Sequence, residues 1–112
     1  MCTHQANRYA GDLHGAIKAY ERELDCARDA HNLPTLGRTY SNLGITHGMM
    51  KQYKKSISCH EKSLALAKED GDQQAAGRAH GNLGISYGLL KKFTKAIKHH
   101  EERYASKSSG FN

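Results

Sequence analysis

Residues 42–48 read Asn-Leu-Gly-Ile-Thr-His-Gly, and residues 82–88 read Asn-Leu-Gly-Ile-Ser-Tyr-Gly. The second stretch begins forty residues after the first, and the similarity runs without a gap from residues 37–62 onto residues 77–102. At the same offset, Ala16-Ile17 matches Ser56-Ile57 in a third, more diverged copy. A fixed period of this length is typical of repeat proteins, in which like units stack into one elongated domain.

The forty-residue period divides the chain into three units. Residues 1–32 form a partial first unit, residues 33–72 a second, and residues 73–112 a third with a degenerate C-terminal end. In the third unit the similarity ends after Tyr104, and the polar residues 106–110 predict a frayed end. Because both ends of the chain cut into units, we expect either a piece of a longer array or a homo-oligomer. Both alternatives stay open.

Each unit contains two helices according to its apolar spacing. In the second unit the helical positions are Leu43, His47 and Met50, followed by Tyr53, Ile57, His60, Leu64 and Ala67. Asp70-Gly71-Asp72 predicts a helix end at Gly71 and a new N-cap at Asp72. Gly11-Asp12 and Asn32-Leu33-Pro34 predict further helix starts. We therefore expect an all-α fold, a right-handed α-solenoid of antiparallel helix pairs.

The composition predicts a thin core. Hydrophobic residues make up 38% of the chain, which has two Phe and no Trp. Gly44 and Gly84 fall inside the expected helices, where glycine is unfavourable unless another segment must come close. We expect them to face the small residues Ser56 and Ala96 on the following helices. The sequence offers no such reason for two further helical glycines, Gly48 and Gly88.

The repeat unit resembles the tetratricopeptide repeat. That family combines a Leu-Gly pair, an aromatic residue three positions later and a small residue twelve positions after the glycine. The third unit carries Leu83, Gly84, Tyr87 and Ala96, whereas the second carries Leu43, Gly44, His47 and Ser56. The period of forty is longer than the usual unit of about 34 residues. The resemblance covers nearly the whole chain.

The longer unit resembles those of the Pins/LGN group of G-protein-signalling scaffolds. The third unit carries Arg78-Ala79, Asn82-Leu83-Gly84, Ala96-Ile97 and His100-Glu101, and the second adds residues 64–69 and Gly71-Asp72. The chain departs from that group at Ile45 and Ile85, where the group often has Asn. The resemblance implies a non-enzymatic scaffold that holds a partner peptide in a concave groove, in signalling, polarity or trafficking.

Helical spacing singles out one candidate binding face in each of the two later units. Arg38, Asn42, Ile45 and Met49 share a face, and Arg78, Asn82, Ile85 and Leu89 repeat it. Arginine can pair with carboxylates, asparagine with a peptide backbone, and the aliphatic residues with apolar side chains. We therefore expect a protein or peptide partner with acidic residues. The alternative is that Arg38 and Arg78 only solvate the stack.

A basic ridge offers a second kind of partner. It consists of Lys51, Lys54, Lys55, Lys91, Lys92, Lys95 and Lys98. The net charge is +6, and residues 91–112 contribute six basic and two acidic residues to it. Such a ridge could bind nucleic acid or another anionic partner, although solvated lysines are the commoner outcome and we expect no nucleic acid. A purely structural spacer is the third alternative.

Catalytic and metal motifs give weaker signals. Residues 84–88 match G-x-S-x-G, but that motif needs a strand before its serine, and a helix is expected here. The eight histidines lack zinc-site spacing, so we expect no metal and no cofactor. His60 and His100 are expected to fill a half-buried packing position, and His99 to be exposed.

The sequence also bears on the compartment. Cys2, Cys26 and Cys59 are odd in number and form no C-x-x-C pair, which favours a reducing compartment. We find no apolar run long enough for a membrane span and no signal-peptide core in residues 1–7. A cytoplasmic protein is therefore expected.

Overall fold

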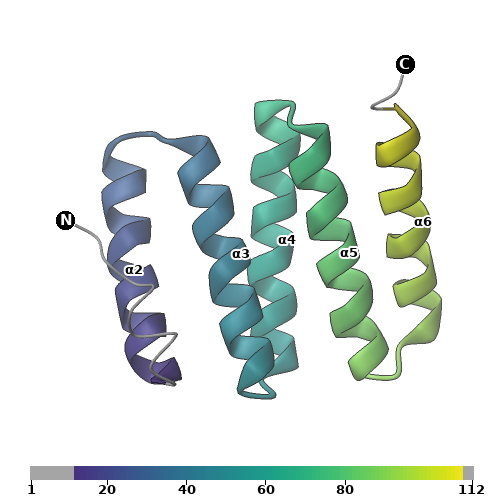
Figure 1. Ribbon diagram of the computed structural model, residues 1–112, viewed down its shortest axis with the longest axis horizontal. Coiled ribbons are helices and arrows are strands. Elements are labelled where there is room, and N and C mark those ends of the chain that lie inside the picture. Colours follow the sequence, from purple (N-terminus) through teal and green to yellow (C-terminus); the bar gives the residue numbers. More distant parts are fainter. Residues whose placement is uncertain (1–11, 110–112) are drawn as a thin grey trace.

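The protein is a row of antiparallel helices (Figure 1). The computed structural model describes the backbone of residues 12–109 and the side chains of residues 12–105. Within that range there are five helices and no strand. The helices are α2 (Leu13–Asp29), α3 (Leu33–Met49), α4 (Tyr53–Asp70), α5 (Gln73–Leu89) and α6 (Phe93–Ser109). Each helix packs against its neighbours in the chain, so the predicted all-α solenoid is confirmed.

The four turns between these helices share one geometry. One residue in each turn has a positive φ, and these residues are His31, Lys51, Gly71 and Lys91. At the first turn the N–H of His31 donates to the carbonyl of Arg28, and that of Asn32 to the carbonyl of Ala27. This pair of bonds is the Schellman motif, and it recurs at every turn. Turns of one kind every twenty residues therefore keep the helices in regular register.

The predicted helix starts are also confirmed. Side-chain oxygens of Asp12, Asn32 and Asp72 each accept a hydrogen bond from a backbone N–H three residues further on. Pro34 lies in the first turn of α3. Gln52 makes no such cap, since its Oε1 accepts a hydrogen bond from His47 Nδ1 at 2.8 Å. Gly11 lies outside the described residues.

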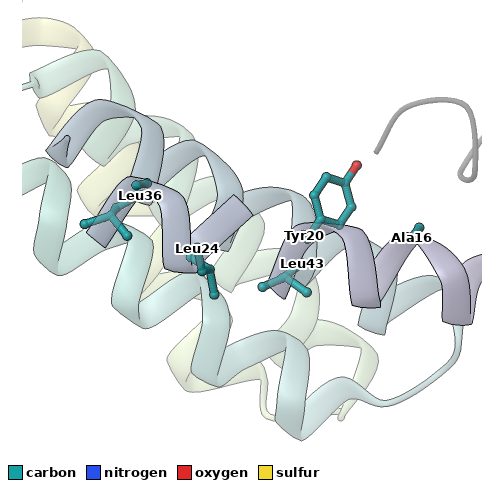
Figure 2. Packing of buried hydrophobic residues seen from close by; sticks show 6 residues of the cluster. Ala16, Tyr20, Leu24, Leu36 and Leu43 are labelled. Carbon is teal, nitrogen blue, oxygen red and sulfur yellow. The ribbon is translucent and has the colours of Figure 1, made fainter. Parts of the chain in front are cut away.

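The core is thin, as the composition predicts. A cluster of buried residues lies between α2 and α3 and contains Ala16, Tyr20, Leu24, Ala27, Leu36 and Leu43 (Figure 2). Further along, small polar residues such as Thr39, Thr46 and Ser56 are fully buried. Small side chains let helices lie close together, and the molecule is only 19 Å thick, about two helix diameters.

The expected partners of Gly44 and Gly84 are wrong. A Cβ on Gly44 would meet the ring of His60 at 2.5 Å, and one on Gly84 would meet the ring of His100 at 2.6 Å. Ser56 instead lies opposite Gly48, one helical turn away. In an antiparallel pair each turn forward on one helix matches a turn backward on the other, and the predicted pairing was displaced by one turn.

The expectations for two histidines fail at the C-terminal helix. His100 is exposed although its equivalent His60 is 2% exposed, because α4 packs between α3 and α5 whereas α6 packs against α5 alone among the described helices. His99, expected to be exposed, is half-buried. The helix α6 extends to Ser109, and Gly110 lies outside the described residues.

Candidate functional site

The residues of the predicted binding face lie on α3 and α5, two helices in direct contact. Its two arginines are exposed and its two asparagines half-buried. Its four apolar residues are exposed, with Met49 and Ile85 each at 56%. Exposed aliphatic residues at equivalent positions of two helices are thus a repeated surface feature. The whole set is Arg38, Asn42, Ile45, Met49, Arg78, Asn82, Ile85 and Leu89.

Part of this face borders a cleft of about 240 Å³ between α3, α4 and α5. Arg38 and Asn42 line it from α3, and Arg78 lines it from α5. The other five predicted residues are not part of the cleft lining. The structure therefore brings both arginines and one asparagine together, and leaves the aliphatic residues on open surface.

The side of the cleft formed by α4 is small and partly polar. Ser63, Leu66 and Ala67 of α4 line it, and Ser63 Oγ donates a 2.9 Å hydrogen bond to the carbonyl of Gly37 on α3. That bond ties α4 to α3.

Two carboxylates line the same cleft and were missed by the sequence analysis. Asp70 ends α4, and Asp72 caps α5 by accepting a 3.0 Å hydrogen bond from the N–H of Ala75. Together with Arg38 and Arg78, they give the cleft both negatively and positively charged side chains. The sequence showed both aspartates as turn residues, and only the meeting of three helices places them beside the arginines.

The basic ridge lies beside a second, more open depression of about 380 Å³. Lys51, Lys54, Lys55 and Tyr53 line it from the α3–α4 turn, and Leu90 lines it from the end of α5. Lys95 stands apart, with its Nζ 5.4 Å from the centre of the Tyr87 ring. The seven predicted lysines thus do not share one depression.

A histidine pair joins α5 to α6, and the sequence analysis missed it. His80 Nδ1 and His99 Nδ1 are 3.0 Å apart, and the His99 ring stacks on Tyr87 at 5.5 Å between centroids. Burial lowers the pKa of His80, and the positive charges of His99 and Lys68 lower it further. Burial also lowers the pKa of His99. The one available signal was that both positions hold other residues in the second unit, Tyr40 and Cys59.

The weaker motifs have plain structural roles. Ser86, the serine of the G-x-S-x-G match, is buried inside α5 with its Oγ 3.4 Å from Ser56 Oγ. In the described part of the chain no three His, Cys, Asp or Glu residues come close enough to hold a metal. Cys59 is a free thiol, and Cys2 lies outside the described residues. None of the described helices is long and apolar enough to cross a membrane.

Comparison with known proteins decides the family. A family model described as "Tetratricopeptide repeat" matches residues 4–69 and 35–109. The chain belongs to the tetratricopeptide repeat family. Tetratricopeptide repeats are generally protein-interaction scaffolds. No curated protein matches the chain. Among solved structures, the crystal structure of MamA is similar at 18% identity over 98% of this chain and 97% of that one, with a TM-score of 0.30.

Proposed function

We propose that this tetratricopeptide chain is a non-enzymatic scaffold that holds an extended peptide with acidic residues along the exposed face of α3 and α5. The observation that carries the proposal is the cleft between α3, α4 and α5, which Arg38, Asn42 and Arg78 line together. Two guanidinium groups on neighbouring helices can each pair with a carboxylate. Asn42 can bond the peptide backbone between them.

The aliphatic residues of the same helices support a peptide rather than a small anion. Ile45 and Met49 continue the line of Arg38 and Asn42 along α3, and Ile85 and Leu89 do so along α5. All four are exposed in the structure. A ligand that extends from the cleft over these residues gains apolar contact as well as charge pairing.

The finer assignments form part of this proposal. We take residues 1–32, 33–72 and 73–112 as the repeat units, with α3 and α4 in the second and α5 and α6 in the third. The motif shared with the Pins/LGN group favours a role in signalling, polarity or trafficking. A cytoplasmic location suits such a role and the free thiol of Cys59.

The basic ridge supports a second candidate function. Lys51, Lys54 and Lys55 line one depression, and they would attract a polyanion such as nucleic acid. Binding of that kind falls steeply with salt and has little sequence preference. Peptide binding in the cleft depends on two arginines and on apolar contact, so it is expected to depend less on salt.

A peptide-display selection on the purified chain tests the proposal. The wild type is compared with the Arg38→Glu/Arg78→Glu double variant at physiological salt, and circular dichroism establishes that both are equally helical. We expect the wild type to enrich a shared acidic motif that the variant does not. As a matched control, Lys54→Glu/Lys55→Glu has the same change of charge in the ridge and should keep the motif. No enrichment on a folded wild type would remove the proposal.

A further inference from the structure

Positive charge gathers at the edge of the molecule where the α3–α4 and α5–α6 turns lie, the lower edge in Figure 1. The sequence has no Asp or Glu in residues 30–60 or 73–100, which include both turns. The α4–α5 turn at the opposite edge contains Asp70 and Asp72 instead. Five exposed lysines occupy the two basic turns and the first turn of α4. These turn lysines are Lys51, Lys54, Lys55, Lys91 and Lys92.

The turn lysines have no counter-charge within the described part of the chain. Among residues 12–105 the structure shows no ion pair that involves any of them. Lys51, Lys54 and Lys55 line the depression of about 380 Å³ together with Leu90, so this cluster of charge reaches from the α3–α4 turn to the end of α5. A cluster of unpaired positive charge attracts an anionic partner.

Two exposed aliphatic residues border the turn lysines. Met49 ends α3 and Leu89 ends α5, and their side chains are 56% and 54% exposed. Because α3 packs against α2, α4 and α5, the exposure of Met49 does not come from a missing neighbour. Met49 and Leu89 are also the last residues of the proposed peptide face, at its border with the turns. Each turn thus combines an exposed aliphatic side chain with lysines.

This combination favours a lipid surface over nucleic acid. The backbone of a nucleic acid offers little to an aliphatic side chain, whereas at a bilayer such a side chain reaches the boundary between headgroups and acyl chains. Lysines beside it interact with anionic lipids, which are abundant in the cytoplasmic leaflet. None of the turn residues is an arginine, whose planar fork is the usual partner of a guanine base.

We propose that the edge formed by the two turns docks on an anionic membrane surface, with the turn lysines at the headgroups and with Met49 and Leu89 inserted beneath them. The cleft that Arg38 and Arg78 line also contains Asp70, so it lies towards the opposite edge. Membrane docking therefore does not rest on the proposed peptide function, and it leaves the cleft accessible.

Flotation with lipid vesicles tests the proposal on the full chain. Vesicles of phosphatidylserine and phosphatidylcholine in equal parts are compared with pure phosphatidylcholine at physiological salt, and only the anionic vesicles should bind. Each lysine near an anionic surface raises affinity about fivefold, so Lys54→Glu/Lys55→Glu should weaken binding by about tenfold or more. Arg38→Glu/Arg78→Glu has the same change of charge in the cleft and should keep most of the binding. Equal loss in both variants would reduce the effect to net charge and overturn the proposal.

A tryptophan reporter tests whether the aliphatic residues enter the bilayer. The chain has no Trp, so Leu89→Trp introduces a single one at the end of α5. Gln74→Trp is the matched control, at an exposed position at the other end of the same helix. We expect anionic vesicles to shift the emission of the Leu89→Trp variant to shorter wavelength and to leave that of the Gln74→Trp variant unchanged. The reverse result would place the bilayer at the wrong edge.

Nucleic acid is the competing occupant, and Met49→Gln/Leu89→Gln separates it from lipid. The double variant keeps every charge but removes the aliphatic surface, so its binding to anionic vesicles should fall about tenfold. Its binding to a duplex oligonucleotide, if the wild type shows any, should not change. Vesicle binding that the double variant leaves unaltered would contradict the inserted residues. Binding of the oligonucleotide without binding of vesicles would make nucleic acid the occupant and overturn the proposal.

Discussion

The imidazole rings of His80 and His99 meet with their Nδ1 atoms 3.0 Å apart, across the boundary between α5 and α6. One Nδ1 must donate and the other accept, so at least one of the two rings has to be neutral. The second unit has Tyr40 and Cys59 at the same positions, and neither of these residue types has a cationic form. At these two positions the packing of α6 on α5 therefore depends on protonation, whereas that of α4 on α3 does not.

Acidification is expected to weaken the contact between α5 and α6. Burial lowers the pKa of His80 and of His99. Both positive and negative side chains also act on the pair. These charges are Lys68 and Glu61 on α4 and Lys98, His100 and Glu102 on α6. A lowered pKa means stability that is complete above about pH 6.5 and lost as the pH falls. We expect a loss of about 1 kcal/mol from this pair between pH 7.5 and 5, the net value of one hydrogen bond. Urea unfolding at each pH measures it.

The second unit supplies the control for this prediction. The double variant His80→Tyr/His99→Cys installs the pair found at Tyr40 and Cys59 and leaves every other histidine in place. Its free energy of unfolding should fall less with acid than that of the wild type. Hydrogen exchange should localise the difference to α6. Equal slopes for the two proteins would contradict the assigned role of the pair.

Sequence periodicity predicted the helices well because its signals are local. Each helix start needs only its own capping residue, as with Asn32 and Asp72, and the αL turn at Gly71 needs only its own glycine. The exposure of Ile45 and Ile85 could also be predicted, because helical spacing alone puts them away from the packed side of the helix.

Side-chain partners between helices were harder to predict, since they depend on register. Gly44 was paired with Ser56, but the tight turn at Lys51 sets the antiparallel register so that Gly44 meets His60. The pairing of His80 with His99 needs the same register and a particular ring orientation. The position of Asp70 in the cleft needs three helices to meet, which no local pattern encodes.

We expect His60 to make the stability of the core sensitive to acid at a second place. The ring is buried beneath Gly44, its Nδ1 has no hydrogen-bond partner among the described residues, and burial lowers its pKa to about 4. The stability from neutral His60 is complete above the unfolded pKa of about 6.5 and is lost as the pH falls towards 4. The full loss is about 3 kcal/mol, from 1.36 kcal/mol per pKa unit.

The variant His60→Phe removes this titration but keeps a planar ring over Gly44. We expect its free energy of unfolding to depend less on pH than that of the wild type between pH 6.5 and 4. His14→Gln, a change at an exposed histidine on α2, serves as the control and should leave the profile unaltered. A His60 resonance that titrates near pH 6.5 by NMR in the folded protein would exclude the explanation.

Alanine at three helical glycines should give three different results. A Cβ on Gly88 meets nothing within 4 Å, so Gly88→Ala should stabilise the protein by about 0.5–1 kcal/mol through helix propensity. Gly84→Ala displaces the ring of His100, which is exposed and can move, so its effect should be small. Gly44→Ala collides with the buried ring of His60 and should destabilise by about 1–3 kcal/mol.

Thermal unfolding of the three alanine variants gives their order directly. The expected order of Tm is Gly88→Ala, then Gly84→Ala, then Gly44→Ala. Combining Gly44→Ala with His60→Ala removes the collision and should recover part of the loss relative to His60→Ala alone. If Gly44→Ala alone were as stable as Gly88→Ala, the close contact with His60 would not exist.

The αL turns predict a stabilising change at Lys91. This lysine has a φ of 61°, a conformation that costs a residue with a Cβ about 1 kcal/mol, whereas Gly71 takes the same place in the α4–α5 turn with a φ of 70°. Lys91→Gly should therefore raise the free energy of unfolding by about 0.5–1 kcal/mol, after allowance for the greater freedom of glycine in the unfolded chain. The reciprocal change, Gly71→Ala, should lower it by about 1 kcal/mol. Urea midpoints at neutral pH measure both, and changes of the same sign in the two variants would show that backbone strain does not govern these turns.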